Sequence, residues 1–321
     1  MFSGGFTWEA VSAVRGDADT SREEDLPALS ALVDKSLLQA APGSRGELRF
    51  SMLETIREHA YEQLERSGEL ALSARRHGEY FCGLAECAAP RLSSAERADW
   101  LQLLDLEMGN LRAALSWSTG EGDPVIALRL AGALAWFWVF RGSIIEGSRW
   151  TRLALGCSAP VDAGRERGLA LYAAAALAWK REEFRPAAQH IDEAISLLRP
   201  SGERRPLALA LALAGLIGTS LEDPERASRL QEEALSIMRE LNDPWGIAYG
   251  LSNMGDAQFK HGQFEAAGRN YLESLELFSI LRDDWGRGIN LLALGNVEWE
   301  LGNPAAARMR YEASVDLFRE M

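Results

Sequence analysis

Two of the three lysines in this chain stand in the same sequence context. Lys180 follows Trp179 and Lys260 follows Phe259, and Trp299 occupies the matching aromatic position in a later, related stretch of the chain. Cationic and aromatic side chains at neighbouring positions suit the capture of a peptide or an anionic ligand. These residues therefore predict one of two things. Either they form a binding surface, whose contact through the lysines weakens with salt, or the rings fill the space between helices and the lysines are solvated.

Patterns typical of catalysis or metal binding do not occur in the sequence. His77, Cys82 and Cys87 are spaced as H-x4-C-x4-C, which is not a usual zinc-ligand spacing. There is no G-x-S-x-G or H-E-x-x-H motif, and no Gly-Lys pair that could belong to a phosphate loop. We therefore expect no enzymatic activity, no catalytic or metal-binding residues and no cofactor.

Composition narrows the class of protein further. The 321 residues are 47% hydrophobic and 25% charged, as in globular proteins, and the net charge is −13. An acidic chain repels phosphate backbones, so direct nucleic-acid binding is disfavoured. Three cysteines without disulfide spacing, and the lack of a signal peptide or a long apolar run, predict a cytoplasmic protein that does not engage a membrane.

An internal repeat supplies the elements that would position the binding residues. The shift that superimposes Trp245 on Trp285 also superimposes Gly255 on Gly295, and the same register extends back to about residue 125. Each unit predicts two amphipathic helices joined by a short turn. Such helix pairs stack because neither can bury its apolar face alone. Asp243 and Asp283 are predicted to cap the helices that follow them.

The stretches LSNMGDAQFKHGQFEAAGRNYLESL and LLALGNVEWELGNPAAARMRYEASV resemble the tetratricopeptide repeat in its longer-period form. The resemblance implies that the first helix of each unit lines a concave binding face. The residues that we expect on this face are Trp136, Phe140, Tyr172, Trp179, Lys180, Tyr249, Asp256, Phe259, Lys260, Asn296 and Trp299.

The N-terminal segment 1–75 follows another pattern. Helices are predicted over 6–14, 25–40 and 53–68, with Thr7 as an N-cap and Gly68 as a helix end, and a β-hairpin is predicted over 37–52. This order is the outline of a winged helix. Residues 1–75 contain eight basic and thirteen acidic residues, which favours a packing role over DNA binding.

The stretches FSGGFTWEAVSAV, LSALVDKSLLQ and RFSMLETIREHAYEQL resemble the winged helix of bacterial NB-ARC or STAND signal-transduction ATPases, and RRHGEYFCGLAE resembles the helical linker that follows it there. The resemblance implies a mainly α chain: a partial winged helix with one small hairpin (1–74), a helical linker (75–124) and a tetratricopeptide-like solenoid. Its units are expected at 125–164, 165–204, 205–244, 245–284 and 285–321.

The resemblance implies the C-terminal part of a larger regulator, with a nucleotide-binding domain upstream. We expect a non-enzymatic sensor that binds a protein, a peptide or a small inducer on the concave face and regulates an NTPase or transcription module. One alternative is a free-standing scaffold for protein interactions. The other is a transcription factor that binds DNA through the winged helix, which the acidic balance disfavours.

Overall fold

The computed structural model describes residues 1–16, 22–43, 46–160 and 162–320 and is mainly helical. Its first part is a small winged helix with helices α1 (Trp8–Arg15), α2 (Arg22–Asp34) and α3 (Glu54–Ser67) and strands β1 (Phe6–Thr7), β2 (Gln39–Pro42) and β3 (Leu48–Ser51). The antiparallel sheet has the order β1-β3-β2. The predicted hairpin is confirmed, and so are the Thr7 cap, which accepts a hydrogen bond from the Ala10 amide, and the left-handed end at Gly68.

Two predictions for this region are wrong in detail. The helix predicted over 25–40 ends at Asp34, because the chain turns at Ser36 with a positive φ of 58° and then enters β2. The segment 6–14 is not helical throughout, because Phe6 and Thr7 form a third strand beside β3. Phe6 and Phe50 are register partners in that pair and both are buried, so core packing sets the strand.

The linker consists of α4 (Leu70–Ala88), a short 3-10 helix η1 (Ala89–Ser93) and α5 (Arg97–Thr119). The winged helix and the linker share one apolar core, in which Phe6 and Phe50 lie with Phe81 and Leu104. Asn110 of α5 accepts a hydrogen bond from the Ser3 amide at 2.8 Å and donates one to the Gly5 carbonyl at 2.9 Å. The α5 helix therefore holds the winged helix through both apolar and polar contacts.

The solenoid has the five-unit plan that the repeat predicts. In the first unit the first helix is broken at Leu134. The helices of the five units are α6 (Pro124–Ala133), α7 (Ala135–Phe140) and α8 (Ile144–Gly156); α9 (Gly164–Lys180) and α10 (Phe184–Leu198); α11 (Arg204–Ser220) and α12 (Pro224–Glu240); α13 (Pro244–Lys260) and α14 (Phe264–Ile280); and α15 (Asp284–Glu300) and α16 (Pro304–Glu320).

The predicted caps are confirmed, and a small residue brings the paired helices together. Asp243 and Asp283 cap α13 and α15, and each accepts a hydrogen bond at 3.0 Å from the glycine amide three residues on. Glycine at 255 permits close helix packing, since an added Cβ would lie 2.6 Å from the ring of Tyr271. The repeat therefore depends on capping and on small residues where the sequence placed them.

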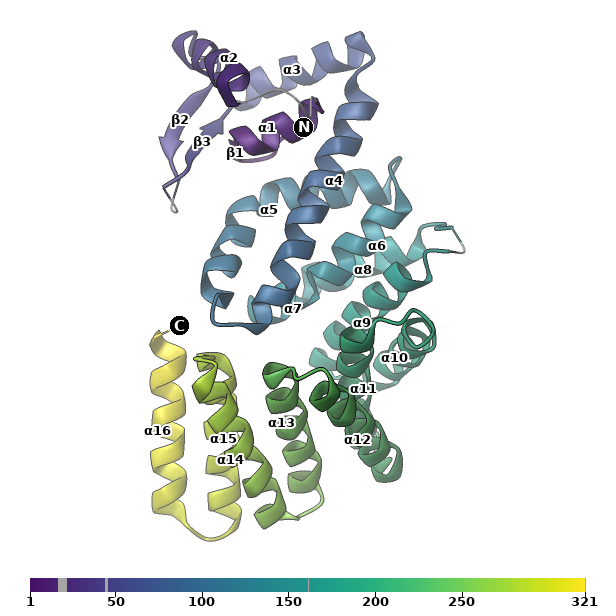
Figure 1. The fold of residues 1–321 in the computed structure, drawn as a ribbon, viewed down its shortest axis with the longest axis vertical. Coiled ribbons are helices and arrows are strands. Elements are labelled where there is room, and N and C mark those ends of the chain that lie inside the picture. The colour runs from purple at the N-terminus through teal and green to yellow at the C-terminus, as the bar shows by residue number, and fades with distance from the viewer. Residues whose placement is uncertain (17–21, 44–45, 161, 321) are drawn as a thin grey trace.

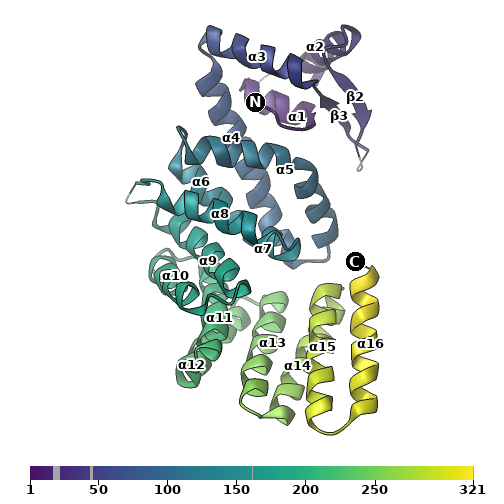
Figure 2. The same ribbon diagram turned by 180° about the vertical axis from the view of Figure 1, so that it is seen from behind.

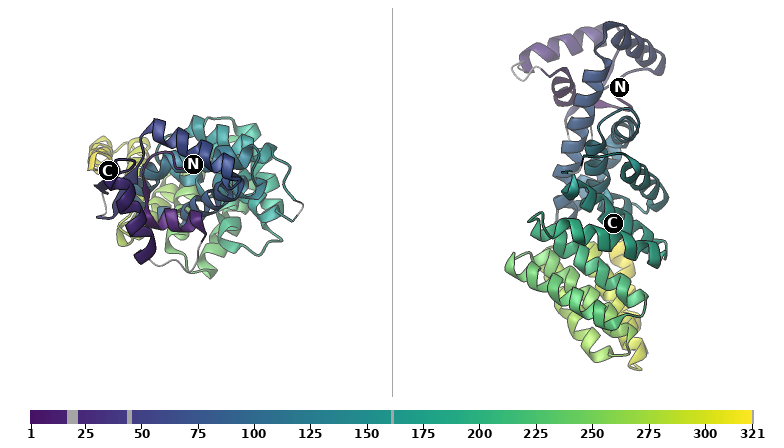
Figure 3. Two further views of the ribbon diagram at one scale, coloured as in Figure 1. Left: turned by 90° about the horizontal axis from the view of Figure 1, so that it is seen from above. Right: turned by 90° about the vertical axis from the view of Figure 1, so that its right-hand side faces the viewer.

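The stack of helix pairs curves as it proceeds. Figure 1 shows the winged helix at one end of the molecule and the pairs from α9 to α16 curving beneath α5–α8. The opposite view in Figure 2 and the two views in Figure 3 show the same elongated shape. As a result, the start of α15 contacts the start of α5, although the two are far apart in the sequence. This return of the chain forms a concave space between the first and the last repeats.

Candidate functional site

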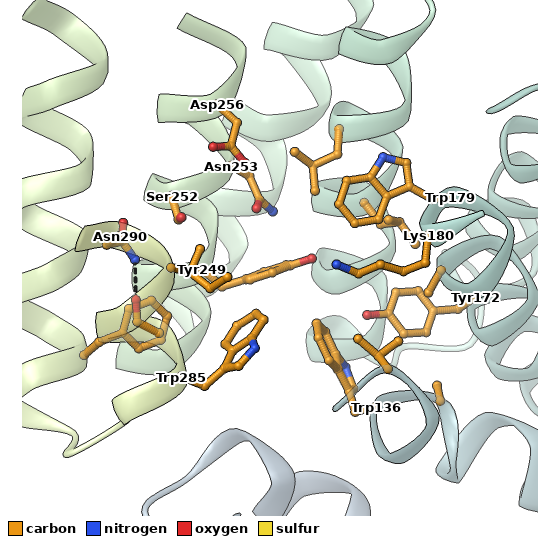
Figure 4. Close-up of a pocket in the computed structure, with 18 residues that line it drawn as sticks. Trp136, Tyr172, Trp179, Lys180, Tyr249, Ser252, Asn253, Asp256, Trp285 and Asn290 are labelled. Carbon is orange, nitrogen blue, oxygen red and sulfur yellow. Dashed lines mark hydrogen bonds between the residues drawn. The ribbon is translucent and has the colours of Figure 1, made fainter. Parts of the chain in front are cut away.

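A cavity of about 230 Å³ lies on the concave side of the solenoid. Its walls come from α7, α9, α11, α13 and α15, the first helices of the five units, together with Phe278 of α14. Figure 4 shows the lining side chains, with Trp136 and Trp285 at one end and Asp256 and Trp179 at the other. Aromatic rings form most of the apolar wall. They are Trp136, Tyr172, Trp179, Tyr249, Phe278 and Trp285.

The cavity is closed at one end because the first repeat reaches across to the fourth and fifth. The ring of Trp136 in α7 meets Trp245 and Tyr249 at centroid distances of 5.7 Å and Trp285 at 6.5 Å, all nearly edge to face. Edge-to-face aromatic pairs at these distances add stability beyond the area that they bury. The aromatic contacts therefore join repeats that are far apart in the stack.

Polar pairs link neighbouring repeats at the start of their first helices. In each pair an acidic residue just before one first helix accepts from a side chain of the preceding first helix. Arg165 pairs in this way with Glu203 at 2.8 Å, and Arg205 pairs with Asp243 at 2.6 Å. At the next joint the residue in the arginine position is Trp245. Its indole N–H provides only one of the hydrogen bonds that the next acid receives.

The missing guanidinium at this joint comes from the linker. Arg97, the first residue of α5, donates to both carboxylate oxygens of Asp283, with 2.6 Å between Nη2 and Oδ2, while Trp245 donates to Oδ2 at 2.8 Å. The Arg97 guanidinium also lies over the rings of Phe140 and Trp285, 4.5 and 5.7 Å from their centroids. The two charged side chains are 7% and 0% exposed. This contact, which we call the clasp, fixes the α15 wall of the cavity to the linker.

Further along α5, Glu107 and Asn110 connect the helix to the winged helix. Glu107 accepts from buried Arg49 of β3 at 2.5 Å and from Asn110 at 2.7 Å, and Asn110 holds the segment before β1. The helix between Arg97 and Glu107 rises by about 15 Å. One rigid helix thus touches the cavity wall at its first residue and the winged helix near its middle.

Two charged side chains face the cavity. Lys180 of α9 lies 4.8 Å from the centroid of the Trp179 ring, and Asp256 of α13 accepts a hydrogen bond from the Tyr271 hydroxyl at 2.7 Å. Both side chains line the concavity and are exposed to solvent, although the walls around them partly desolvate their charged groups. Desolvation raises the pKa of Asp256 to about 6, against the opposing effects of Tyr271 and Lys180. It lowers the pKa of Lys180, opposed by Asp256.

Two buried amides also line the cavity. Asn253 of α13 is 4% exposed and Asn290 of α15 is 0% exposed. Among the described residues, the Asn253 amide nitrogen and the Asn290 carbonyl oxygen have no hydrogen-bond partner, although Asn290 Nδ2 donates to the Gly286 carbonyl at 2.8 Å. The indole nitrogen of Trp136, another lining residue, is a third such atom. Buried polar groups are nearly always satisfied, so three such atoms in one cavity require an explanation.

The structure gathers some of the predicted groove residues and separates others. Those that line the cavity are Trp136, Tyr172, Trp179, Lys180, Tyr249 and Asp256. Those that lie outside it are Phe140, Phe259, Lys260, Asn296 and Trp299. Each residue of this second group has other surroundings.

Phe140 stacks on Trp136 at 5.3 Å and supports the clasp from behind the cavity. Phe259 packs against Phe264 at 5.3 Å. Both rings therefore have packing partners of their own outside the enclosed space.

Lys260 donates to the Thr219 carbonyl at 2.6 Å, so the two lysines of the repeat register differ in their contacts. Asn296 accepts from the Tyr311 hydroxyl at 2.9 Å, and Trp299 is 62% exposed on the last repeat. The curvature of the stack points these positions away from the enclosed space.

Sequence reasoning missed Arg97, Trp285 and the two asparagines. Internal comparison does carry a signal for the asparagines, because the equivalent positions one repeat before Asn253 and Asn290 hold Leu213 and Gly250. Polar residues at apolar positions of a repeat indicate a function beyond packing. For Arg97 the only signal is that Trp245 stands where the two preceding repeats have an arginine. That signal does not tell which residue of the chain pairs with Asp283 instead.

The described residues contain no group of three potential metal ligands among His, Cys, Asp and Glu. Burial raises the pKa of the Cys82 thiol to about 12, which makes it a poor nucleophile. Within the described ranges, no helix combines the length and the apolar character that a membrane span requires. The cavity is thus equipped for binding through rings, two charges and amides.

Comparison with family models identifies both ends of the chain. Residues 1–65 match the model of a winged helix-turn-helix domain, and residues 246–320 match a tetratricopeptide repeat model. A protein of Mycobacterium tuberculosis with the provisional name HTH-type transcriptional regulator is 38% identical over 152 residues, as is one from Mycobacterium bovis. The match covers 46% of this chain and 17% of each relative, so the chain spans about a sixth of their length.

Solved structures share the fold at low sequence identity. A Signal Transduction ATPase with Numerous Domains protein with a tetratricopeptide repeat sensor, from Pyrococcus horikoshii, has a TM-score of 0.61 and 16% identity over 98% of this chain and 42% of its own. A Rap protein complexed with competence and sporulation factor has a TM-score of 0.59 and 12% identity over 83% and 71%. The chain thus combines a winged helix with a tetratricopeptide solenoid and is homologous to proteins named as transcriptional regulators.

Proposed function

We propose that this chain is a non-enzymatic sensor module that binds a peptide, a protein segment or a small inducer in the solenoid cavity and relays occupancy to its winged helix. The observation that carries the proposal is the clasp. Trp285 and Asn290 of α15 line the cavity, and Asp283, just before α15, is held by Arg97 of α5. A ligand that shifts α15 would act directly on the helix that holds the winged helix.

The direction of signalling depends on which arrangement of the solenoid the ligand contacts more extensively. A ligand can change an equilibrium between two arrangements only if it binds one of them better. The enclosed arrangement brings Trp136 and Trp285 to the same ligand, so a molecule that touches both rings favours closure. When Trp136 and Trp285 stay together, Arg97 stays paired with Asp283. When they separate, the clasp no longer restrains α5, and the contact of Glu107 on α5 with Arg49 can change.

The named relatives support a regulatory output. The mycobacterial homologues carry the name of transcriptional regulators, and a neighbour in fold pairs a tetratricopeptide sensor with a signal-transduction ATPase. We infer that this module likewise regulates transcription or an NTPase domain, which would belong to a longer protein. We also infer a cytoplasmic location, because Cys82, Cys87 and Cys157 are free thiols.

A second candidate function is direct DNA binding, which the winged helix-turn-helix match favours. The charge pattern opposes it, since residues 1–75 have thirteen acidic and eight basic residues. Arg49 is also unavailable to phosphates because it is buried against Glu107. A protein-binding scaffold without signalling is the third candidate, and it predicts no coupling between the cavity and the winged helix.

A cavity-filling substitution tests the relay without a ligand. Ala176→Trp places a ring among the lining residues, and Glu300→Trp places the same ring at an exposed position of the last repeat. Hydrogen exchange should change at the start of α15 and at the α5–β3 contact in Ala176→Trp only. Exchange that changes in the cavity walls but not around Glu107 would refute the relay and leave a scaffold.

A further inference from the structure

Two opposite charges face each other across the cavity without pairing. Lys180 extends from α9 and Asp256 lies on α13, on the other wall, and Figure 4 shows the ammonium group directed towards the middle of the space. They are the only charged residues among the described residues that line the cavity. Within the described structure neither takes part in a salt bridge, and Lys180 lies against the Trp179 ring instead.

The repeat itself does not require these charges. The equivalent of Asp256 in the next repeat is Asn296, which accepts from the Tyr311 hydroxyl as Asp256 accepts from the Tyr271 hydroxyl. A neutral amide is therefore sufficient for that structural hydrogen bond. The carboxylate at 256 adds a negative charge whose use lies in the cavity.

Lys180 likewise differs from the residue at the equivalent position of another repeat. Lys260, in the same register as Lys180, donates to the Thr219 carbonyl at 2.6 Å. Lys180 has no such hydrogen bond within the described residues and rests on the Trp179 ring instead. Its ammonium group is therefore available to an anion in the cavity.

Unsatisfied amides add neutral donors and acceptors to the same space. Asn253 and Asn290 have an unpartnered amide nitrogen and carbonyl oxygen in the described structure, and both residues are more than nine-tenths buried. The corresponding positions of other repeats hold Leu213, Ala293 or Gly250. Polar groups of a ligand are candidate partners for these atoms.

We propose that the cavity binds a small zwitterion with an apolar body, namely a free amino acid with a large side chain or a short peptide. Its carboxylate would meet Lys180, its ammonium group would meet Asp256, and its apolar part would contact Trp136 and Trp285. The volume of about 230 Å³ is below the roughly 300–1,000 Å³ typical of pockets for drug-sized ligands, which favours a small ligand. This inference rests on the proposed function, because it names the ligand of the same cavity.

The titration behaviour of the walls supports the assignment. Desolvation raises the pKa of Asp256 to about 6 and lowers the pKa of Lys180, and the attraction between the two groups offsets only part of each shift. A ligand ammonium group favours the ionised carboxylate. Of the groups around it, Lys180 also favours ionisation and Tyr271 donates to it. Affinity for the zwitterion should therefore fall as the pH drops below about 6.

The test is calorimetric titration of the full chain with tryptophan, phenylalanine and leucyl-phenylalanine, each also as the N-acetyl and the C-terminal amide form. We expect at least one free form to bind with millimolar affinity or better, and each blocked form to bind about tenfold or more weakly. The free amino acids and the dipeptide distinguish the two sources of the zwitterion.

Variants assign each ligand charge to its wall. Lys180→Met should bind the free ligand and its C-terminal amide with equal affinity, because the partner of the ligand carboxylate is gone. Asp256→Asn should bind the free ligand and its N-acetyl form with equal affinity, because the partner of the ligand ammonium group is gone. The asparagine keeps an acceptor for Tyr271, as Asn296 does for Tyr311. Lys260→Met is the matched control, since that lysine lies outside the cavity, and it should retain wild-type discrimination. Thermal melting of each variant is the check that it folds.

Two results would overturn the inference: no binding by any free form, or equal binding by free and blocked forms. If blocked forms or longer peptides bind in the cavity and alter exchange around Glu107, the ligand class is wrong while the sensor function stands. If the zwitterion binds as assigned and exchange around Glu107 does not respond, the ligand class stands and the sensor function is wrong.

Discussion

Replacement of Arg97 by methionine should release the last repeats from the linker. Asp283 is completely buried, and removal of one partner of a buried ion pair typically costs about 3–5 kcal/mol. Asp283 would keep its hydrogen bonds from Trp245 at 2.8 Å and from the Gly286 amide at 3.0 Å. We therefore expect a cost near the lower limit, about 3 kcal/mol, in the free energy of local opening at the start of α15.

Hydrogen exchange followed by mass spectrometry measures this quantity. A cost of about 3 kcal/mol corresponds to roughly 100-fold faster exchange over residues 284–292. Arg205→Met is the matched control, because Arg205 makes the equivalent pair with Asp243 one repeat earlier while 34% of its side chain stays exposed. A partly exposed pair contributes about 1 kcal/mol or less, so exchange near Asp243 should rise only about fivefold or less.

A double variant separates the charge from packing. In Arg97→Met with Asp283→Asn no buried charge is left unpaired, and the asparagine can still cap α15. Much of the protection over 284–292 should return. Equal effects of Arg97→Met and Arg205→Met, or a double variant that is the sum of the two single changes, would refute the view that the buried clasp holds α15.

Three further predictions concern the whole chain. Because the sequence has no phosphate loop, calorimetry should detect neither tight ATP binding nor hydrolysis by the purified chain, and micromolar stoichiometric binding would contradict this. Exchange should be fastest in α16, whose outer face exposes Met309, Val315 and Phe318, and slower at the clasped start of α15; uniformly slow exchange over 285–320 would contradict this. Burial lowers the pKa of His77 to about 4, below its unfolded value near 6.5, so its contribution to stability is complete above pH 6.5 and is lost as the pH falls towards 4. Denaturant titrations should then show that the wild type loses about 2–3 kcal/mol relative to His77→Leu over that range, and parallel curves would contradict this.

The local elements followed from the sequence because their causes are local. The repeat register, the caps at Asp243 and Asp283, the glycine at 255 beside Tyr271 and the hairpin of the winged helix all depend on residues close along the chain. The end of the second helix was misplaced because the left-handed turn at Ser36 and the pairing of β2 with β3 override the apolar pattern. Helical periodicity alone does not reveal either feature.

The enclosed cavity was decided by the tertiary structure. Each repeat adds a small rotation to the stack, and the sum determines whether the first and last units meet. That sum brings Trp136 to Trp285 and Arg97 to Asp283, and it turns Lys180 inward while Lys260 and Trp299 lie outside. The sequence by itself determined the repeating unit and the types of side chain on its first helix. Which of these side chains share one space depends on packing angles between helices, and no single segment of the chain encodes them.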